Sequence, residues 1–363
     1  YRFLKYVGGN MNRHVKKIKS IFFYQKDYTE DVIEDIEDIK DTSFVAIYNP
    51  ECIGIMNATI ELFGKDNSIK LYEIFNDKQI SNIANAIVKH NFKQVIFSTM
   101  AYGYKDLAER IYELNSKIKI KFMWHGSHAL FVNYNEQNFL EDLLQLQKRG
   151  IVHSIGFFKS AMADFYLAKG YNAKLLMNDV NIKDKDDYKK NKEDKRLKIG
   201  LYSSGDRWEK NTYNQLSACA MVKDAYIDII PETKLATSFC KLMSIKTVTD
   251  DAPMSLKRKH LLRRMANNDV NLYVTFTECS PMIPLESFEL GVPCIIGNNT
   301  DFFLNSEKLN DLIVVKEEDN IDEIYDKINT CIEKRDEIMN LYKEWKKDYS
   351  EKVKKLKEDF LND

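Results

Sequence analysis

The chain has 363 residues, of which 44% are hydrophobic and 12% aromatic, so it is long enough for two domains and too apolar to be disordered. Its 54 basic and 55 acidic residues leave a net charge of −1, which excludes a global field that favours nucleic acid and indicates a small neutral or anionic substrate. The six cysteines include no C-x-x-C pair, a pattern typical of reduced thiols rather than of a zinc site or disulfide framework. No apolar run approaches the ~20 residues of a membrane span, so we expect a soluble, cytoplasmic protein.

The first forty residues carry two weak signals. Residues 6–10, YVGGN, indicate a strand followed by a glycine turn. Residues 14–26 mix basic and apolar side chains. A core-packed helix or strand is the favoured interpretation of this second stretch, and a peripheral contact with the anionic inner face of a membrane is the alternative.

From residue 43 onward, short apolar strands alternate with amphipathic helices. Strands are predicted at 44–48, 70–74, 94–98, 118–123, 153–157 and 173–176, and helices at 53–63, 79–90, 104–115, 138–148 and 160–169. Such alternation predicts an α/β fold with a mainly parallel sheet that helices cover on both faces. We therefore expect a Rossmann-like domain over residues 1–182.

One histidine in this domain is a candidate site residue. The strand at 118–123 continues into the sequence WHGSH, which places His125 at its carboxyl end, beside Gly126. Ligands of α/β sheets bind beyond the carboxyl ends of strands, so His125 is placed to meet one. A histidine with a purely structural role is the alternative.

A second alternation follows a highly charged stretch. Residues 183–198 are nearly all charged and lack apolar periodicity, which favours a solvated linker over an exposed helix face. Strands are then predicted at 199–203, 225–230, 272–276 and 294–297, and helices at 213–221, 256–267 and 285–290. These elements predict a second Rossmann-like domain over residues 199–335. The basic cluster at 257–264 is interpreted as a solvated helix face, with a membrane or polyanion contact as the alternative.

The final segment is predicted to be helical. Apolar residues recur at spacings of three and four through residues 336–363, as on one face of a helix. This face packs either on the rest of the chain or against another copy of it, and the oligomeric state stays open.

The most informative segment covers residues 271–303. After the strand at 272–276, a loop at 277–284 carries Glu278, and a helix is predicted to open near Leu285 with Glu286 in its first turn. Unpaired amides at such a helix start suit a phosphate, whereas carboxylates suit hydroxyl groups. A nucleotide diphosphate sugar has hydroxyl-rich ends with phosphates between them. A surface turn with incidental glutamates is the alternative interpretation.

The segment resembles the retaining glycosyltransferases of the GT-B fold, specifically the family-4 group. Their motif is E-x7-E followed by a helix and G-x-P. Here it reads Glu278, seven residues, Glu286 and then Gly291, Val292 and Pro293. The resemblance implies two Rossmann-like domains facing a central cleft and a C-terminal helix that crosses back to the first domain. Residues 178–181, NDVN, lie where the family has a short N-G-V-D hinge.

The resemblance also implies roles for the residues of this motif. Glu286 would bind the ribose hydroxyls of the nucleotide, and Glu278 would lie against the donor sugar as a catalytic residue. The backbone around Ser280, Met282 and Ile283 would bind the diphosphate.

Two further segments match the family in kind. The loop SSGDRWEKN supplies Arg207 and Lys210 where the family has an arginine and a lysine that clamp the diphosphate, and His125 matches a histidine that lies against the donor sugar. Cations are needed there because charge grows on the phosphate oxygen as the glycosidic bond breaks. An arginine and a lysine supply what a metal supplies elsewhere, so we expect no metal and no cofactor beyond the nucleotide sugar.

The predicted function is therefore transfer of a hexose or N-acetylhexosamine from a uridine or guanosine diphosphate sugar, with retained configuration. The acceptor would be a glycan, a lipid-linked sugar or a protein. Two alternatives remain: a GT-B sugar-nucleotide epimerase, and a non-catalytic GT-B module that assists another transferase.

Overall fold

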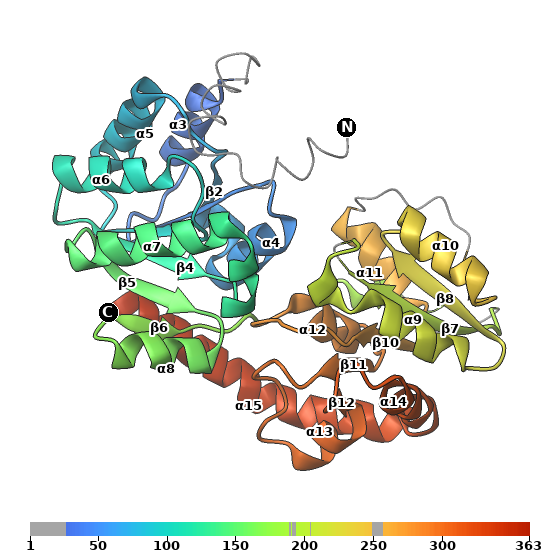
Figure 1. Cartoon of the computed structure of the whole chain (residues 1–363). Coiled ribbons are helices and arrows are strands. Elements are labelled where there is room, and N and C mark those ends of the chain that lie inside the picture. The colour runs from blue at the N-terminus through green and yellow to red at the C-terminus, as the bar shows by residue number, and fades with distance from the viewer. Residues whose placement is uncertain (1–26, 189, 191–193, 204, 249–256) are drawn as a thin grey trace. The chain divides into compact units, whose positions relative to one another are not determined.

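The computed structural model describes residues 27–188, 190, 194–203, 205–248 and 257–363. The glycine turn predicted at 6–10 and the basic, apolar stretch at 14–26 lie outside these ranges. By its internal contacts the chain divides into two units, the first comprising Tyr1–Asn178 with Lys355–Asp363 and the second Asp179–Lys354 (Figure 1). Residues 179–182, assigned above to the first domain, thus group with the second unit.

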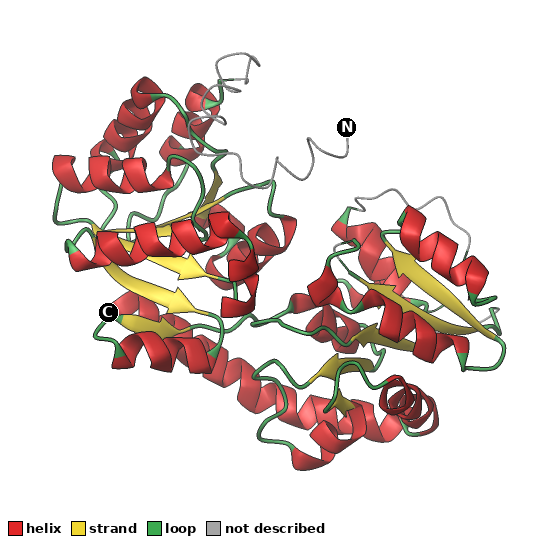
Figure 2. Cartoon of the chain, viewed as in Figure 1, coloured by secondary structure: helices red, strands yellow, loops and turns green. Residues whose placement is uncertain are grey.

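The described strands of the first unit form a six-stranded parallel sheet in the order β2-β1-β3-β4-β5-β6. The strands are β1 (Val45–Tyr48), β2 (Ser68–Lys70), β3 (Gln94–Phe97), β4 (Lys119–Trp124), β5 (Val152–Phe157) and β6 (Ala173–Leu175). The helices are α3 (Thr29–Glu37), α4 (Ile53–Phe63), α5 (Asp77–Lys89), α6 (Tyr104–Leu114), α7 (Tyr134–Lys148) and α8 (Ser160–Ala168), with short 3₁₀ turns at Lys65–Asn67 and His128–Val132. Helices flank the strands, as Figure 2 shows, which explains why the central strands are apolar on both faces.

One strand prediction in this unit is wrong. The strand predicted at 70–74 already ends at Lys70, because the backbone then turns toward the loop that follows β3. There the amide of Ile74 donates to the carbonyl of Tyr102 at 2.9 Å. The apolar residues of this stretch, Leu71 and Ile74, are buried in the core, and the amide of Leu71 still donates to the carbonyl of Tyr48 in β1 at 2.8 Å.

The described strands of the second unit form another six-stranded parallel sheet, in the order β12-β11-β10-β7-β8-β9. The strands are β7 (Leu197–Tyr202), β8 (Ala225–Ile230), β9 (Lys246–Thr247), β10 (Val270–Tyr273), β11 (Cys294–Gly297) and β12 (Val314–Val315). The helices are α9 (Thr212–Ala220), α10 (Lys234–Leu242), α11 (Arg258–Ala266), α12 (Met282–Glu289), α13 (Glu307–Ile313), α14 (Ile321–Glu333) and α15 (Arg335–Asn362), with 3₁₀ turns at Lys185–Tyr188 and Trp208–Lys210. The α/β class predicted from the sequence is confirmed in both units.

A buried polar network fixes α12 against this sheet. Asn268 donates to the hydroxyl of Tyr202 at 2.6 Å and to the side chain of Asn271 at 2.8 Å. Asn271 in turn donates to the hydroxyl of Ser287 in α12 at 2.8 Å. Gly200 of β7 makes room for these amides, since a Cβ there would collide with both asparagine side chains. Through the bond from Asn271 to Ser287, this buried network holds α12 beside β10.

The basic cluster at 257–264 is not a wholly solvated face. Arg264 forms an ion pair with the buried carboxylate of Asp228 in β8, and Arg258 forms one with Glu286 of α12. Lys259 stays exposed, 3.6 Å from Asp187. Periodicity could not reveal these pairs, because it carries no information on which helices lie side by side.

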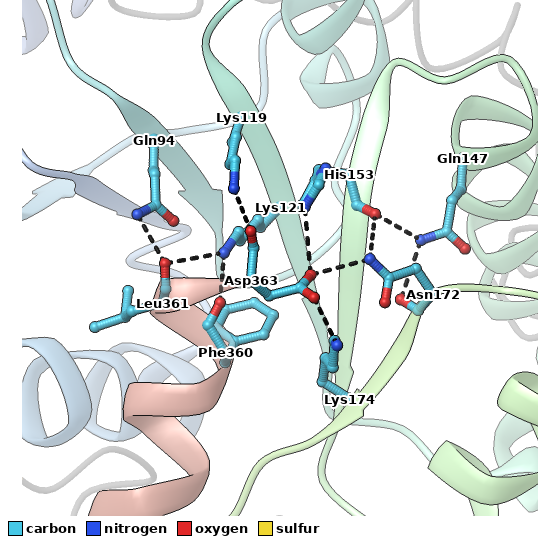
Figure 3. Close-up of polar contacts among 10 residues, drawn as sticks. All are labelled: Gln94, Lys119, Lys121, Gln147, His153, Asn172, Lys174, Phe360, Leu361 and Asp363. Carbon is cyan, nitrogen blue, oxygen red and sulfur yellow. Dashed lines mark hydrogen bonds and ion pairs between the residues drawn. The ribbon is translucent and has the colours of Figure 1, made fainter.

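Helix α15 starts in the second unit, and its last residues belong to the first. The ammonium of Lys121 in β4, fully buried, donates to the last-turn carbonyls of Phe360 and Leu361 (Figure 3). Asp363 lies 2.6 Å from Lys174 and 3.4 Å from His153. Cations at a helix C-terminus balance the partial negative charge of its free carbonyls, so these contacts hold the helix end against strands β4, β5 and β6 of the first sheet.

Within the described ranges, no helix combines the length and the apolar character that a membrane crossing demands.

Candidate active site

The second sheet has a topological switch point between two neighbouring strands. β7 lies between β8 and β10 in the sheet. The chain continues from β7 through β8 to β9 on one side and from β10 through β11 to β12 on the other, so the switch point lies between β7 and β10. Open α/β sheets bind ligands beyond the carboxyl ends of strands at such a point. The loop after β7, residues 203–211, carries Lys210. The loop after β10, residues 274–281, carries Glu278.

These two residues meet in a compact charged cluster. The Nζ of Lys210 forms an ion pair with Oε1 of Glu278 and lies 3.2 Å from the hydroxyl of Tyr273, the last residue of β10. That hydroxyl donates to the same Glu278 oxygen at 2.8 Å. Lys210 is 6% exposed, whereas the Glu278 side chain keeps 17% of its surface exposed. The sequence predicted both charged residues but not Tyr273.

Burial, together with the neighbouring Glu278 carboxylate, raises the pKa of Tyr273 well above its usual value. The phenol therefore stays protonated across the physiological range and remains a donor to Glu278. A buried cation, a neutral phenol and a partly exposed carboxylate thus lie together at the strand end.

Gln215 of α9 holds the two loops together, and the sequence analysis missed it. Its side-chain amide donates to the carbonyls of Lys210 and Asn211 at 2.9 and 3.2 Å, and its oxygen accepts from the amide of Val274 at 2.9 Å. Only 2% of Gln215 is exposed. A buried glutamine with both ends paired fixes the backbone of Lys210 and Asn211 relative to that of Val274.

The neighbouring loops add further ties at the same edge. The amide of Phe276 donates to the carbonyl of Glu209 at 2.9 Å. Asn211, in the left-handed region with φ of 52°, donates through its side chain to the carbonyl of Glu318. Asn299 donates to the carbonyl of Thr275. The loops after β7, β10, β11 and β12 are therefore linked to one another by hydrogen bonds.

Helix α12 begins earlier than predicted. It opens at Met282 rather than near Leu285, because Pro281 has an extended backbone at the N-cap and Pro284 lies in the first turn, where a missing N–H has no helical acceptor to lose. Glu286 consequently lies in the second turn, not the first. The amides of Met282 and Ile283 occupy the first turn, whose N–H groups lack helical acceptors.

Ser280, predicted beside the diphosphate, is 6% exposed and hydrogen-bonds with the hydroxyl of Tyr349 in α15. The start of α12 is thereby also fastened to the long helix of its own unit.

Glu286 is buried and paired with an arginine. It is 3% exposed, and the Nε and Nη2 atoms of Arg258, at the start of α11, each lie 2.9 Å from its Oε1. The sequence analysis placed Arg258 in the solvated cluster. The clue available from the sequence was that an acid on the buried face of a helix needs a cation.

Arg207 lies at the surface of the same loop. Its side chain is 52% exposed, and its Nε lies 2.9 Å from the carboxylate of Glu209. Beside it, the rings of Trp208 and Phe276 stack with centroids 6.3 Å apart. Both rings are exposed, so an apolar surface borders the charged cluster.

His125 lies in the first unit, directly after β4. Burial lowers its pKa to about 3, although a hydrogen bond to the backbone of Ser98 acts in the opposite sense. Its ring stacks on Phe158 with centroids 4.0 Å apart. Nε2 is buried and has no hydrogen-bond partner within the described part of the chain, so Nδ1 makes the Ser98 bond. His125 is therefore neutral, with a buried acceptor nitrogen.

The described residues contain no group of three or more His, Cys, Asp or Glu side chains placed to hold a metal ion.

The two α/β units, each built on a parallel sheet with flanking helices, have the architecture of the GT-B fold. Among similar solved structures, Anabaena HepE in complex with UDP has a TM-score of 0.62 at 12% identity, over 88% of this chain and 98% of that chain. HepE in complex with UDP-glucose has a TM-score of 0.61 at 11% identity, over 87% and 97%. The UDP-forming α,α-trehalose-phosphate synthase from Burkholderia vietnamiensis has a TM-score of 0.51 at 9% identity, over 86% and 99%.

The sequence itself matches no known family model and no curated protein. At these low identities the structural likeness establishes the fold, and function has to be argued from the site.

Proposed function

We propose that the protein is a retaining, metal-independent glycosyltransferase that moves a hexosyl or N-acetylhexosaminyl group from a UDP-sugar to a glycan, lipid-linked or protein acceptor. The observation that carries this proposal is the buried Lys210 beside Glu278 at the switch point of the second sheet, immediately before α12. The likeness to HepE, which was solved with UDP and with UDP-glucose, supports uridine as the base.

In this proposal the diphosphate binds between Lys210 and the first turn of α12. Lys210 neutralises the charge that develops on the leaving phosphate, and the amides of Met282 and Ile283 donate hydrogen bonds to its oxygens. Arg207, exposed at the edge of the site, adds a second cation. Glu286 accepts hydrogen bonds from the ribose hydroxyls.

The reaction breaks the bond between the anomeric carbon and the phosphate oxygen, and its electron pair leaves with UDP. The acceptor oxygen attacks the same face of an oxocarbenium-like sugar, and the departing phosphate oxygen takes the acceptor's proton. Glu278 lies against the sugar and balances its positive charge. His125 is neutral and its Nε2 is buried, so it is given no step in this reaction.

The test is a nucleotide-sugar panel followed by product analysis. Binding of a UDP-sugar to the folded state alone raises the melting temperature, and we expect UDP, UDP-glucose and UDP-N-acetylglucosamine to do so more than their guanosine counterparts. UDP release that depends on an acceptor, with an α-linked product by NMR, supports retaining transfer. An epimerised UDP-sugar without acceptor identifies an epimerase, and binding without turnover identifies a non-catalytic module.

Metal independence is tested in the same assay. Excess EDTA should leave the rate of UDP release unchanged. Loss of activity that a divalent ion restores would contradict this part of the proposal.

A further inference from the structure

The ion pair between Arg258 and Glu286 goes beyond the proposed roles, because no role has been given to Arg258. Glu286 lies in α12 with 4% of its side chain exposed, and Arg258 lies in α11 with 26% exposed. Both nitrogen contacts, from Nε and from Nη2, converge on the single oxygen Oε1 at 2.9 Å. An arginine fork in this geometry fixes the position of a carboxylate, whereas a lysine point charge does not.

The location of Arg258 indicates that this contact has a use other than helix stability. Arg258 is the first residue of α11, and Lys257 occupies the N-cap without a side-chain hydrogen bond to the helix. Cations are disfavoured at a helix N-terminus, where the helix dipole is positive, and acids are favoured. The first turn of α11 contains no acid. Local helix energetics therefore oppose an arginine here, and its ion pair with Glu286 is what offsets them.

Burial of Glu286 makes the arginine necessary for any ligand role. A carboxylate removed from water without a cation shifts toward its protonated form. A protonated glutamate would offer one donor and fewer acceptor positions to a pair of hydroxyls. Arg258 supplies that cation and holds the carboxylate in one orientation.

We propose, given the proposed function, that Arg258 is a positioning residue for ribose recognition. It holds the Glu286 carboxylate in place to bind the vicinal 2′- and 3′-hydroxyls of a ribonucleoside diphosphate. Preference for ribonucleotides over nucleotides that lack these hydroxyls then depends on Arg258 as much as on Glu286. A merely structural arginine would affect stability without affecting this preference.

The experiment measures Kd for UDP and for 2′,3′-dideoxy-UDP by calorimetry. We expect the parent protein to bind UDP at least roughly tenfold more tightly, because hydrogen bonds to a charged group are lost with the hydroxyls. Arg258→Met and Glu286→Gln should each reduce this ratio to within about twofold of unity, and the double variant should reduce it no further, as for two residues that act together. Dideoxy-UDP affinity should change little in any of them.

The control is Lys259→Met, the next residue of α11, whose partner Asp187 is exposed. It should retain the parent ratio. Since the ratio compares two ligands on one preparation, a partly unfolded sample does not alter it. Where Arg258→Met fails to fold, Arg258→Lys keeps the charge without the fork and should show an intermediate ratio.

Three outcomes overturn the inference. If Arg258→Met retains the parent ratio while Glu286→Gln loses it, the arginine is structural. If the parent binds UDP and dideoxy-UDP equally, neither residue recognises the ribose hydroxyls, although the transferase proposal stands. If the parent binds no nucleoside diphosphate at all, the proposed function fails as well.

Discussion

Tyr273 joins the two charged residues of the candidate site. Its hydroxyl accepts a hydrogen bond from Lys210 and donates one to Glu278, and its ring centroid lies 5.4 Å from the lysine ammonium. The three groups therefore form one unit in which each charged residue has two polar partners. A change in any one alters the surroundings of the other two.

Tyr273→Phe removes this shared hydroxyl and keeps the ring. We expect a loss of about 1–3 kcal/mol in the free energy of unfolding, because partly buried charged groups lose a partner, and a lower kcat for UDP release. Urea unfolding and steady-state assays measure the two effects. Tyr226→Phe on strand β8, which β7 separates from β10, is the matched control and should change neither, since its ring contacts Arg196 and Lys246 through the ring face. Equal effects in both variants would contradict a special role for the Tyr273 hydroxyl.

Lys210 should be the residue on which turnover depends most strongly. Lys210→Ala is expected to lower kcat by roughly 10²–10³-fold, the usual effect of removing one group that stabilises developing charge. Circular dichroism and thermal unfolding check that the variant folds. A variant that folds and turns over at the parent rate would remove Lys210 from the mechanism.

For single residues, the sequence analysis identified charged side chains that follow strand ends but missed the side chains that they contact. Lys210 and Glu278 could be found because each follows a recognisable apolar strand within a few residues. Gln215, Tyr273 and Arg258 could not, because their contacts join elements that are far apart in the sequence. The buried pair of Arg258 with Glu286 was taken for a solvated surface for the same reason.

Among the secondary-structure elements, the end of α15 and strand β4 are coupled through a buried amine. Burial lowers the pKa of Lys121 from 10.5 to about 8, partly offset by Asp363. Its ammonium nevertheless donates to the carbonyls of the last helical turn. A buried lysine of this kind is a source of pH-dependent stability.

The sign of this dependence follows from the two pKa values. Between pH 8 and pH 10.5 the unfolded chain binds a proton at Lys121 that the folded protein has released, so this residue makes the free energy of unfolding rise with pH. We expect the parent to gain on the order of 3 kcal/mol over this window relative to Lys121→Met. Urea unfolding at intervals of pH gives the difference. Parallel curves for the two proteins would show that Lys121 does not titrate in this way.

The sequence predicted long elements better than short ones. β8, β11 and α4 have the predicted bounds, because each is a sustained apolar run or stripe with clear ends. β9 and β12 contain only two residues each, too few for any alternation to register. Helix α12 was placed late because two prolines normally mark a break, whereas here Pro281 is the N-cap and Pro284 lies in the first turn, where no helical N–H bond is needed.

For the whole molecule, the first unit is discontinuous in sequence. It contains Tyr1–Asn178 and Lys355–Asp363, and the second unit is inserted between them. The alternation of strands and helices predicted two α/β units. It could not predict at which residue of α15 the helix begins to pack on the first unit, because the apolar stripe of an amphipathic helix continues unchanged where its packing partner changes.

Phe360 is the apolar anchor of this returning segment, with no exposed surface. Phe360→Ala should destabilise the first unit by about 3–5 kcal/mol through the cavity left behind, and UDP affinity, which we assign to the second unit, should stay near the parent value. Hydrogen exchange should increase in peptides of β4 and β5. Phe165→Ala, at an exposed ring of the same unit, is the control and should have a much smaller effect. Loss of UDP affinity with unchanged exchange would contradict this assignment.

The position of Lys355–Asp363 has a consequence for synthesis on the ribosome. Chains are synthesised from the amino terminus, so residues up to Asn178 are made well before the segment that packs against their sheet. Until that segment arrives, Lys121 lacks the carbonyls that it binds in the finished protein, and Gly156 lacks the ring of Phe360. The second unit, Asp179–Lys354, is contiguous and lies entirely before that segment in the sequence. The first unit therefore cannot complete its contacts until the whole of the second unit has been synthesised.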